Sequence, residues 1–529
     1  MQRDVLAVAS ALVDLGVKAG DHVVLLSPNR LEWLYCDLGI QAAGAITVPI
    51  YANVTKEVAQ QIALDCEAKL AIVSDQQEAE KLPIQGPLRT IALMHKDVAE
   101  WVARAPRQQA EISSRLARIQ PDDVCTIVYT SGTTGEPKGA ELAHKNVVDI
   151  CRAALKVHPL SENDSTLSFL PYSHVYERIN IFTGLMFGGQ AWISQGIDHL
   201  AAELAVVQPT LICSVPRVYE KMYAAVMANV RGASASRQSL FRWAVRVGTR
   251  YSREPNRSPV LKAEHAVADR LVLGPLRRRL TGGRLRFFIS GGAALAREIE
   301  EFFWAIGVPI LNGWGMTETS SPACSNTLHQ HRFLTVGKPL PGVELKIAGD
   351  GEILVKSPGN MLGYHNKPEA TAEILKDGWI YTGDIGEIDA DGFLKITDRK
   401  KSLFKTAGGK YIAPVQLEFA LARDPLIMRS VAIGDGRPYV TALIVPDRAA
   451  AAKQGLDEAG LKAHIQKTVD DVNTHLGSWE TIKYFTLLPA DFTEESGELS
   501  LKLDVKRKVV AQHYEDQIES MYTGKTKPA

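Results

Sequence analysis

The sequence lacks an excess of either charge, a cluster of cysteines and an apolar leader at its start. Its 60 basic side chains are balanced by 60 acidic ones, so the overall charge does not favour nucleic acid as a partner. The six cysteines show no metal-ligand spacing and mostly lie in apolar runs, which predicts reduced core residues in a cytoplasmic protein. Met1 opens an amphipathic helical pattern rather than the apolar segment of a signal peptide.

An unbroken apolar segment of bilayer-spanning length is also missing. Residues 38–55 and 179–197 are uncharged, but proline, asparagine, glutamine or glycine interrupts each of them. We expect both segments to lie in a buried α/β core.

What the chain does contain is the composition of an ordinary globular protein, with 46% hydrophobic and 23% charged residues. A length of 529 residues predicts two or more domains. Short apolar runs, such as 22–26, 70–73, 211–213 and 287–289, alternate with helical patterns over most of the chain. This pattern predicts an α/β fold whose sheets are covered by helices on both faces.

The pattern changes from Gly342 onward. The runs 343–347, 351–355 and 392–396 alternate between apolar and polar residues, as strands of a half-exposed antiparallel sheet do. A charged link follows at 398–402. We therefore predict a large N-terminal domain at 1–398, a hinge at 399–402 and a small α+β domain at 403–529.

Basic residues gather between Asn229 and Phe287. Arg242, Arg246 and Arg250 are spaced four apart among apolar residues, which predicts a basic amphipathic helix. Such a helix is either a solvated surface or a peripheral contact with an anionic membrane, here the inner face, and both alternatives stay open. No nucleic-acid-reading motif accompanies the charge, so we expect no nucleic-acid partner.

A segment rich in hydroxyl groups and glycine follows the apolar run 124–128. It reads Tyr129-Thr130-Ser131-Gly132-Thr133-Thr134-Gly135-Glu136-Pro137-Lys138-Gly139. Glycines let backbone N–H groups approach phosphate oxygens, hydroxyl groups donate further hydrogen bonds, and the lysine adds a positive charge. Gly139 rather than Ser or Thr follows Lys138, so this is no Walker A loop. The segment predicts a polyphosphate site, against the simpler alternative of a flexible surface loop.

Further motifs follow in order along the chain. They are Ser290-Gly291-Gly292-Ala293-Ala294, Asn312-Gly313-Trp314-Gly315-Met316-Thr317-Glu318-Thr319, Tyr381-Thr382-Gly383-Asp384, Thr397-Asp398-Arg399-Lys400-Lys401 and Thr406-Ala407-Gly408-Gly409-Lys410. With the segment 129–139 they resemble the core motifs of the adenylate-forming superfamily, and the resemblance covers nearly the whole chain. Within it, the chain is most similar to long-chain fatty acyl-CoA synthetases.

The resemblance implies a fold and a reaction. The large N-terminal domain would contain helix-covered sheets and a β-barrel-like subdomain, and the small C-terminal domain would be mobile about Lys401. A fatty acid carboxylate would attack the α-phosphate of ATP, giving acyl-AMP and pyrophosphate. Coenzyme A would then take the acyl group and release AMP. ATP, Mg²⁺ and coenzyme A are thus the expected cofactors.

The resemblance also implies residue roles. Glu318 would hold Mg²⁺, Thr317 would bind phosphate, Asp384 would accept from both ribose hydroxyls, and Arg399 would contact the ribose and phosphate side. The expected nucleotide- and coenzyme-A-binding residues are Thr130, Ser131, Gly132, Thr133, Thr134, Gly135, Lys138, Gly291, Gly292, Ala293, Asn312, Gly313, Trp314, Gly315, Met316, Thr317, Asp384, Ile396, Arg399, Gly408, Gly409 and Lys410.

The acyl side of the site rests on two further matches. Pro171-Tyr172-Ser173-His174-Val175-Tyr176-Glu177-Arg178 resembles a motif of long-chain synthetases, and it would place the catalytic His174 near the carboxylate end of the acyl pocket. This motif has no acidic residue before Glu177, which disfavours amino acid substrates. Tyr219 is the candidate gate of the acyl tunnel, with an ordinary packed tyrosine as the alternative.

One match fails near the C-terminus, in the run 497–508. Family members commonly carry a catalytic lysine where this chain has Asp504. Lys502 or Lys506 would take that role by a local shift, beside Lys138, Glu318 and Arg399 in the first step.

Other functions stay open at this level. The enzyme would alternatively pass the acyl group from acyl-AMP to a carrier protein, or the chain would be a nucleotide-binding homologue without catalysis. In some family members the segment before the first helix contributes to dimerisation, so a homodimer is one further alternative.

Overall fold

The computed structural model describes residues 1–529 except 84–85, 105, 132–135, 255, 401–402, 409, 494, 500–504 and 524–529. The chain divides into two compact units. The first comprises Met1–Lys346, Leu354–Thr382 and Ile388–Lys395, and the second comprises Ile347–Ile353, Gly383–Glu387 and Ile396–Ala529. The hinge at 399–402 stays a proposal, since Lys401 and Ser402 lie outside the described residues.

The first sheet contains the apolar runs near the N-terminus. In spatial order its strands are β16 (Gly363–Tyr364), β6 (Pro137–Ala143), β5 (Val124–Ser131), β2 (Ile46–Ile50), β1 (His22–Leu26), β3 (Leu70–Val73) and β4 (Thr90–Leu93). The strands from β5 to β4 are parallel to their neighbours, whereas β6 and β16 join antiparallel. The run 22–26, which is apolar from Val23 to Leu26, is therefore an inner strand of this sheet.

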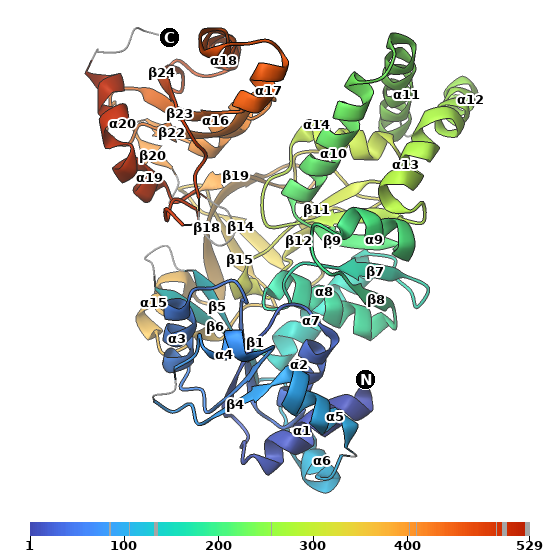
Figure 1. Ribbon diagram of the computed structural model, residues 1–529, viewed down its shortest axis with the longest axis vertical. Coiled ribbons are helices and arrows are strands. Elements are labelled where there is room, and N and C mark those ends of the chain that lie inside the picture. Colours follow the sequence, from blue (N-terminus) through green and yellow to red (C-terminus); the bar gives the residue numbers. More distant parts are fainter. Residues whose placement is uncertain are drawn as a thin grey trace. The chain divides into compact units, whose positions relative to one another are not determined.

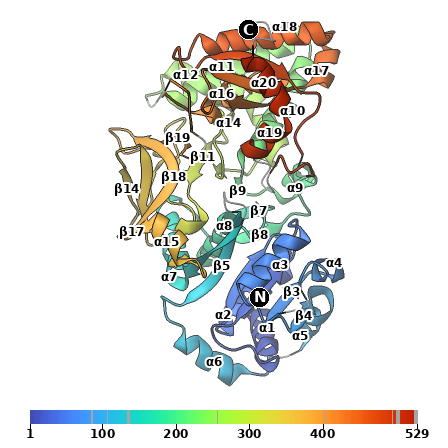
Figure 2. The same ribbon diagram turned by 90° about the vertical axis from the view of Figure 1, so that its left-hand side faces the viewer.

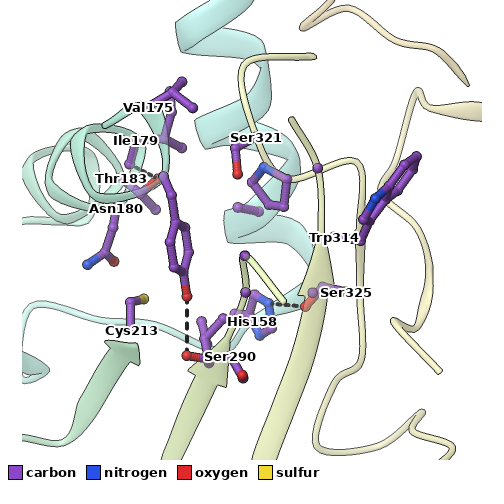
Figure 3. Close-up of a pocket in the computed structure, with 18 of the residues that line it drawn as sticks. His158, Val175, Ile179, Asn180, Thr183, Cys213, Ser290, Trp314, Ser321 and Ser325 are labelled. Atoms are coloured by element: carbon purple, nitrogen blue, oxygen red, sulfur yellow. Dashed lines mark hydrogen bonds between the residues drawn. The ribbon is translucent and has the colours of Figure 1, made fainter. Parts of the chain in front are cut away.

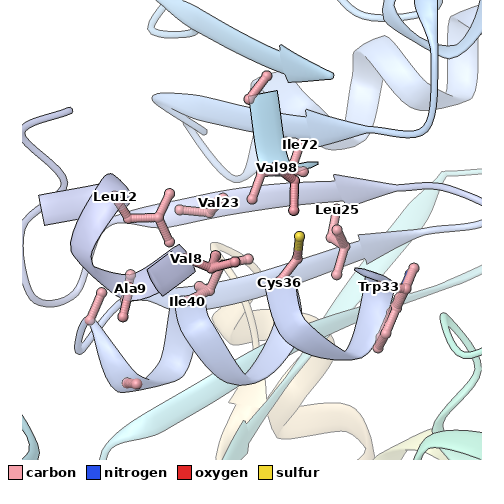
Figure 4. Close-up of a cluster of buried hydrophobic side chains, with 14 of the residues drawn as sticks. Val8, Ala9, Leu12, Val23, Leu25, Trp33, Cys36, Ile40, Ile72 and Val98 are labelled. Carbon is pink, nitrogen blue, oxygen red and sulfur yellow. The ribbon is translucent and has the colours of Figure 1, made fainter. Parts of the chain in front are cut away.

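Helices cover this sheet on both faces (Figure 1). They are α1 (Gln2–Asp14), α2 (Leu31–Ala42), α3 (Lys56–Asp65), α4 (Gln76–Ala79), α5 (Ala99–Ala103), α6 (Gln109–Arg118) and α7 (His144–Val157). Successive residues of β1 face opposite sides, so Val23 belongs to the cluster that includes Val8 and Leu12 of α1, drawn in Figure 4, whereas Val24 belongs to the cluster that includes Ile62 of α3. Burial on both faces explains why the strand is apolar from Val23 to Leu26.

A second sheet follows in the same unit. Its strands, in spatial order, are β13 (Lys338–Pro339), β12 (Cys324–Ser325), β11 (Ile310–Trp314), β10 (Phe287–Ser290), β9 (Leu211–Ser214), β7 (Ser165–Ser168) and β8 (Gln190–Ile193). Its helices are α8 (Val175–Phe187), α9 (Leu200–Val207), α10 (Pro216–Arg231), α11 (Ala235–Arg253), α12 (Pro259–Ala268), α13 (Gly274–Thr281) and α14 (Arg297–Ala305). The loops after β10 and β11 carry the predicted adenine-side motifs.

The segment from Gly342 forms a third sheet, as its alternating pattern predicts. Its strands are β14 (Glu344–Ile347), β15 (Glu352–Lys356), β18 (Trp379–Ile388) and β17 (Leu375–Lys376), with β19 (Leu394–Arg399) paired to β18. Both units contribute residues to these strands. The short helix α15 (Pro368–Ile374) lies beside β17 (Figure 2).

The main segment of the second unit is an α+β arrangement, also as predicted. Its strands are β20 (Phe404–Lys405) paired with β21 (Tyr411–Ile412), and β22 (Ile427–Ile433), β23 (Val440–Pro446) and β24 (Ile482–Leu487) in one sheet. Its helices are α16 (Pro414–Leu421), α17 (Arg448–Lys453), α18 (Glu458–Asn473), α19 (Arg507–His513) and α20 (Glu515–Tyr522).

One further prediction from the sequence is confirmed, whereas the buried core expected for residues 179–197 is wrong for its second half, where Leu185, Met186, Trp192 and Ile197 are exposed. All six cysteines are unpaired and buried, as core residues should be. Among the residues described, no helix has both the length and the apolar character needed to cross a membrane.

Candidate active site

The predicted phosphate segment is the tip of the hairpin formed by β5 and β6. The two strands pair with Thr130 opposite Lys138, and the Thr130 hydroxyl donates to the Lys138 carbonyl at 3.4 Å. Lys138 thus lies on a strand rather than in the loop where the sequence analysis put it. Gly132, Thr133, Thr134 and Gly135 lie outside the described residues, so their phosphate contacts stay predictions, as does that of Ser131.

A close approach of the two strands requires glycine next to this lysine. A Cβ atom on Gly139 would lie 2.6 Å from Cγ2 of Ile127 and 2.9 Å from the ring of Tyr129. The Tyr129 hydroxyl is itself fixed, since it donates to Asp65 at 2.5 Å. The base of the hairpin is therefore closely packed, and this packing fixes the direction in which the Lys138 side chain extends from β6.

Thr317 and Glu318 belong to a short 3₁₀ turn, Thr317–Thr319, that follows β11. The segment before β16 supports this turn: the Met361 N–H donates to the Glu318 carbonyl at 2.8 Å. Both Thr317 and Glu318 are less than one-tenth exposed. Because its backbone is held by this hydrogen bond and its side chain is buried, Glu318 is suited to binding a ligand in one orientation.

Tyr364 of β16 connects Glu318 with Lys138. Its hydroxyl donates to Oε1 of Glu318 at 2.6 Å, and the Lys138 ammonium lies 5.4 Å from the centre of its ring. Tyr364 is not among the site residues predicted from the sequence. No local motif marks it, because its place depends on the pairing of β16 with β6, which joins segments more than two hundred residues apart.

The donors around Glu318 bear on the expected magnesium site. Among the described residues, no group of three or more acidic, histidine or cysteine side chains is arranged to hold a metal ion. Mg²⁺ commonly takes one or two protein carboxylates and completes its octahedron with substrate phosphates and water. A single buried carboxylate beside a lysine-bearing hairpin fits that mode of binding, whereas it would not fit a metal held by protein ligands alone.

An apolar cavity of about 840 Å³, its mouth included, lies between α8 and the ends of β9, β10 and β11 (Figure 3). Gly291, Gly292 and the segment 313–316 line it, so the predicted adenine-side residues and the cavity are continuous. Asn312 and Ala293 are not among its lining residues; Asn312 is buried and Ala293 is exposed. Val175, Ile179 and Thr183 of α8 form the opposite wall.

His174 lies on the wall of this cavity at the start of α8. Its Nδ1 accepts the Tyr176 N–H at 3.1 Å, which caps the helix and leaves the ring proton on Nε2. His158 also lines the cavity, and burial lowers its pKa to about 4, so this ring is neutral. The walls around an acyl chain would therefore be uncharged near both histidines.

Tyr219 is placed differently from the predicted gate. It is fully buried in the core beside Phe288 and Phe303, and its hydroxyl donates to the Ile289 carbonyl at 2.8 Å. Tyr176, not Tyr219, is the tyrosine among the residues lining the cavity. A gating role for Tyr219 stays a prediction, and the packed alternative describes its contacts in this structure.

Glu177, the next residue of the motif, is buried behind the cavity wall. It is 1% exposed and accepts hydrogen bonds from the Ser168 hydroxyl and from the Asn180 amide, the latter at 3.4 Å. Burial raises the pKa of Glu177 to about 7. Asn180 lines the cavity and Glu177 does not, so the hydrogen bond from Asn180 is what connects Glu177 with the cavity wall.

The second unit brings together Asp384 and Arg399, as the motifs predict. Nε of Arg399 lies 3.1 Å from Oδ1 of Asp384, whose side chain is 8% exposed. The adjacent Lys400 forms ion pairs with Asp350 at 2.6 Å and Glu352 at 2.7 Å, and these raise the pKa of Lys400. Two consecutive cations are thus held by three carboxylates.

The other predicted site residues that are described in the second unit lie on separate elements. Ile396 is on β19, and Gly408 and Lys410 lie in the turn between β20 and β21. Lys506 precedes α19, where its N–H donates to the Glu498 carbonyl at 2.7 Å. Lys401, Gly409, Lys502 and Asp504 lie outside the described residues, so the hinge and the position of the missing lysine stay predictions.

Comparison with protein families gives two matches that together span most of the chain. Residues 1–365 match the model described as AMP-binding enzyme, and residues 402–526 match the one described as AMP-binding enzyme C-terminal domain. The second match begins inside the predicted hinge.

Curated proteins of similar sequence extend over the same length. The long-chain-fatty-acid–CoA ligase FadD15 of Mycobacterium bovis is 38% identical, covering 98% of this chain and 90% of the relative. Human long-chain-fatty-acid–CoA ligase 1 is 30% identical over 98% of this chain and 80% of its own.

Solved structures share the fold at lower identity. A fatty acyl CoA synthetase of Mycobacterium tuberculosis has a TM-score of 0.65 at 20% identity, covering 97% of this chain and 92% of its own. The anthranilate CoA ligase AuaEII in complex with anthranoyl-AMP has a TM-score of 0.74 at 21% identity, covering 98% and 92%.

Proposed function

The chain belongs to the AMP-binding enzyme family, and from this premise we propose that it is a long-chain fatty acid–CoA ligase. It activates a fatty acid with ATP to acyl-AMP and pyrophosphate, and then transfers the acyl group to coenzyme A with release of AMP. The relatives that are 37–38% identical over 98% of the chain carry this name.

The observation that carries the proposal is the continuity of the cavity with the nucleotide motifs. One part of its wall consists of Gly291, Gly292 and the segment 313–316, which the family uses on the adenine side. The rest is predominantly apolar and runs along α8 and β9, where an acyl chain would lose contact with water. His174 lines the same cavity, so a carboxylate bound beside it would lie in a space continuous with the nucleotide motifs.

The first half-reaction brings an anion to a polyanion, so charge neutralisation is its main demand. Two unit charges about 4 Å apart repel by roughly 4 kcal/mol at an effective dielectric constant near 20. Lys138 would supply a cation at the phosphates. Glu318 would hold Mg²⁺, which when bound to ATP withdraws negative charge from the phosphate oxygens. The protein provides positioning and charge rather than a covalent nucleophile.

Asp384 and Arg399 would supply the ribose contacts. Asp384 is buried beside Arg399, and a carboxylate there would accept hydrogen bonds from two adjacent hydroxyl groups. Arg399 is 71% exposed although paired with Asp384, so its guanidinium can reach a ligand without breaking a buried contact.

A peripheral membrane contact is part of the same proposal, since the substrate is a lipid. The helix α11 buries Ala244 and Val247 and exposes Arg242 and Arg246, which confirms the predicted amphipathic pattern. The neighbouring α12 exposes apolar side chains, among them Val260 at 77%. Exposed cations beside exposed apolar groups favour binding to an anionic lipid surface.

Incubation of the purified protein with ATP, Mg²⁺, coenzyme A and a series of fatty acids of increasing length tests the proposal. We expect acyl-CoA, AMP and pyrophosphate in equal amounts by mass spectrometry, with the highest kcat/KM for long chains. Accumulation of acyl-AMP with no acyl-CoA would indicate transfer to a carrier protein instead. Nucleotide binding without pyrophosphate release would indicate a non-catalytic homologue.

A further inference from the structure

Tyr364 contacts both residues to which the proposed function assigns the phosphate chemistry in the first unit. Its hydroxyl donates to Oε1 of Glu318 at 2.6 Å, and the Lys138 ammonium lies 5.4 Å from the centre of its ring. The first contact is a hydrogen bond to a carboxylate, and the second is within the range of a cation–π interaction. One side chain thus touches the anionic and the cationic partner of the triphosphate.

The backbone of Tyr364 is fixed on both sides, so these contacts are not those of a loose loop. Tyr364 pairs with Ala140 in the antiparallel ladder of β16 and β6, two residues along β6 from Lys138. Its N–H donates to Oγ1 of Thr371 at 2.8 Å, and that hydroxyl donates to the Lys367 carbonyl at 2.9 Å. The ring therefore has a defined position relative to β6 and α15.

The direction of the hydrogen bond follows from the chemistry of the two groups. A tyrosine phenol has an ordinary pKa of about 10 and keeps its proton at neutral pH, so its hydroxyl can donate to the carboxylate. An ionised carboxylate can only accept, and the bond to Oε1 restricts rotation of the carboxylate group. The remaining acceptor positions of Glu318 then have fixed directions.

We propose that Tyr364 is a positioning residue for the divalent cation: it holds the Glu318 carboxylate in the orientation that binds Mg²⁺ with ATP. Its ring also contacts the Lys138 ammonium, which lies 5.4 Å from the ring centre. The inference rests on the proposed function, which identifies the ligand as Mg²⁺ bound to ATP. Partners that orient a metal-binding carboxylate typically change metal affinity or activity by about 10- to 100-fold when they are replaced.

Tyr364→Phe tests the role because it removes the hydroxyl and leaves the ring beside Lys138. We expect the apparent Kd for Mn²⁺, followed by electron paramagnetic resonance with a non-hydrolysable ATP analogue, to rise about tenfold or more. The Mg²⁺ concentration that half-saturates pyrophosphate release should rise with it, while the KM for the fatty acid stays as in the wild type. The melting temperature of the ligand-free protein provides the measure of folding.

Two further variants separate positioning from general packing. Thr371→Val removes the acceptor of the Tyr364 N–H, and we expect a smaller shift of the Mn²⁺ Kd in the same direction. Tyr35→Phe removes a phenol hydroxyl from α2, outside the site, and should leave Mn²⁺ binding unchanged.

An unchanged Mn²⁺ Kd in folded Tyr364→Phe would overturn the inference, as would a loss of melting temperature with normal metal binding. If that variant does not fold, the Thr371→Val titration decides in the same way. A wild type that binds the metal–nucleotide complex but activates no fatty acid contradicts the proposed function alone, since the Mn²⁺ comparison can still be made.

Discussion

Asp37 and Arg178 form a buried ion pair in the first unit, with side-chain exposures of 0% and 4%. Nε of Arg178 donates to Oδ2 of Asp37 at 2.8 Å, and Nη1 donates to the Thr126 hydroxyl at 2.6 Å. Asp37 lies on α2, Arg178 on α8 and Thr126 on β5. The pair thus connects a helix of the first sheet with the helix that follows His174 and with the first strand of the phosphate hairpin. The last residue of the acyl-side motif thus has a structural partner far away in the sequence.

Replacing one member of this pair should cost much of the stability of the first unit. Asp37→Asn leaves the Arg178 guanidinium buried without a counter-charge, and we expect a loss of about 3–5 kcal/mol in the free energy of unfolding. Urea denaturation followed by circular dichroism measures it. The double variant Asp37→Leu with Arg178→Met should lose less, because no unpaired charge remains.

The control for this prediction is the exposed pair of Lys145 and Asp122. The Asp122 side chain is 71% exposed, so Asp122→Asn should lower the free energy of unfolding by no more than about 1 kcal/mol. Equal losses for Asp37→Asn and Asp122→Asn would contradict the assignment of Asp37 and Arg178 as a stabilising buried pair.

Glu318→Ala and Lys138→Ala should each abolish most acyl-AMP formation while the protein remains folded. Each removes a charge that is needed where negative charge accumulates, and losses of about 10²–10³-fold in kcat are typical for such groups. Fatty-acid-dependent pyrophosphate release is the measurement. Glu162→Ala and Lys156→Ala, which change exposed residues of the same types, are the matched controls. Normal pyrophosphate release in both site variants would refute the assignment.

Much of the fold could be predicted because its signals are local. The runs 22–26 and 70–73 coincide with β1 and β3, since strands buried on both faces need apolar residues at every position. The spacing of Arg242 and Arg246 among apolar residues likewise gave α11. Each prediction needed only the residues of one element.

The residues of the candidate site could be predicted only where they lie inside a short recognisable motif. Glu318 and Asp384 lie in recognisable segments, whereas the position of Lys138 on a strand depends on how far β5 and β6 pair. Tyr364 was missed because its partner strand is distant in the sequence. The motif around Tyr219 left a gate and a packed tyrosine as alternatives, because its depth in the core is not visible in the sequence. Contacts that depend on long-range pairing or on depth in the fold leave no local pattern.

The buried Glu177 predicts a pH dependence of stability. Burial raises its pKa from 4.5 to about 7, so between these values the native state binds more protons than the unfolded state. The free energy of unfolding should therefore fall as the pH rises from about 4.5 to about 7, by on the order of 3 kcal/mol for this group. Glu177→Gln keeps the acceptor for Ser168 and should flatten this part of the profile.

Urea titrations of wild type and Glu177→Gln at a series of pH values give the difference that belongs to this residue, because other buried acids remain in both. The exposed Glu369→Gln serves as the control and should follow the wild type. If the two glutamine variants have the same pH profile, Glu177 does not titrate in this window.

The basic surface of α11 should be measurable as lipid binding. Changing Arg242 and Arg246 together to Gln removes two exposed cations, each worth about 1 kcal/mol near an anionic membrane, so sedimentation with phosphatidylserine-containing vesicles should weaken at least about tenfold. The exposed Arg107 and Arg118, changed to Gln together, should have no effect. A wild type that does not sediment with anionic vesicles at low salt would refute the membrane contact.

The C-terminal tail departs from the family pattern at the position of the catalytic lysine. The family position holds Asp504, and a carboxylate there would repel the triphosphate rather than neutralise it. Lys502 and Lys506 are each two residues away, so either can replace the missing charge only if the tail is shifted in register.

Lys502→Ala and Lys506→Ala should therefore differ, with one variant losing about 100-fold or more in pyrophosphate release and the other remaining close to the wild type. The loss should be confined to adenylation, because no triphosphate is present when coenzyme A attacks the acyl carbon. Transfer from chemically prepared acyl-AMP to coenzyme A should thus proceed in both variants. Asp504→Ala is the control and should not slow adenylation. Undiminished pyrophosphate release in both lysine variants would mean that neither side chain enters the site during adenylation, and that Lys138 and Arg399 neutralise the triphosphate without a cation from the tail.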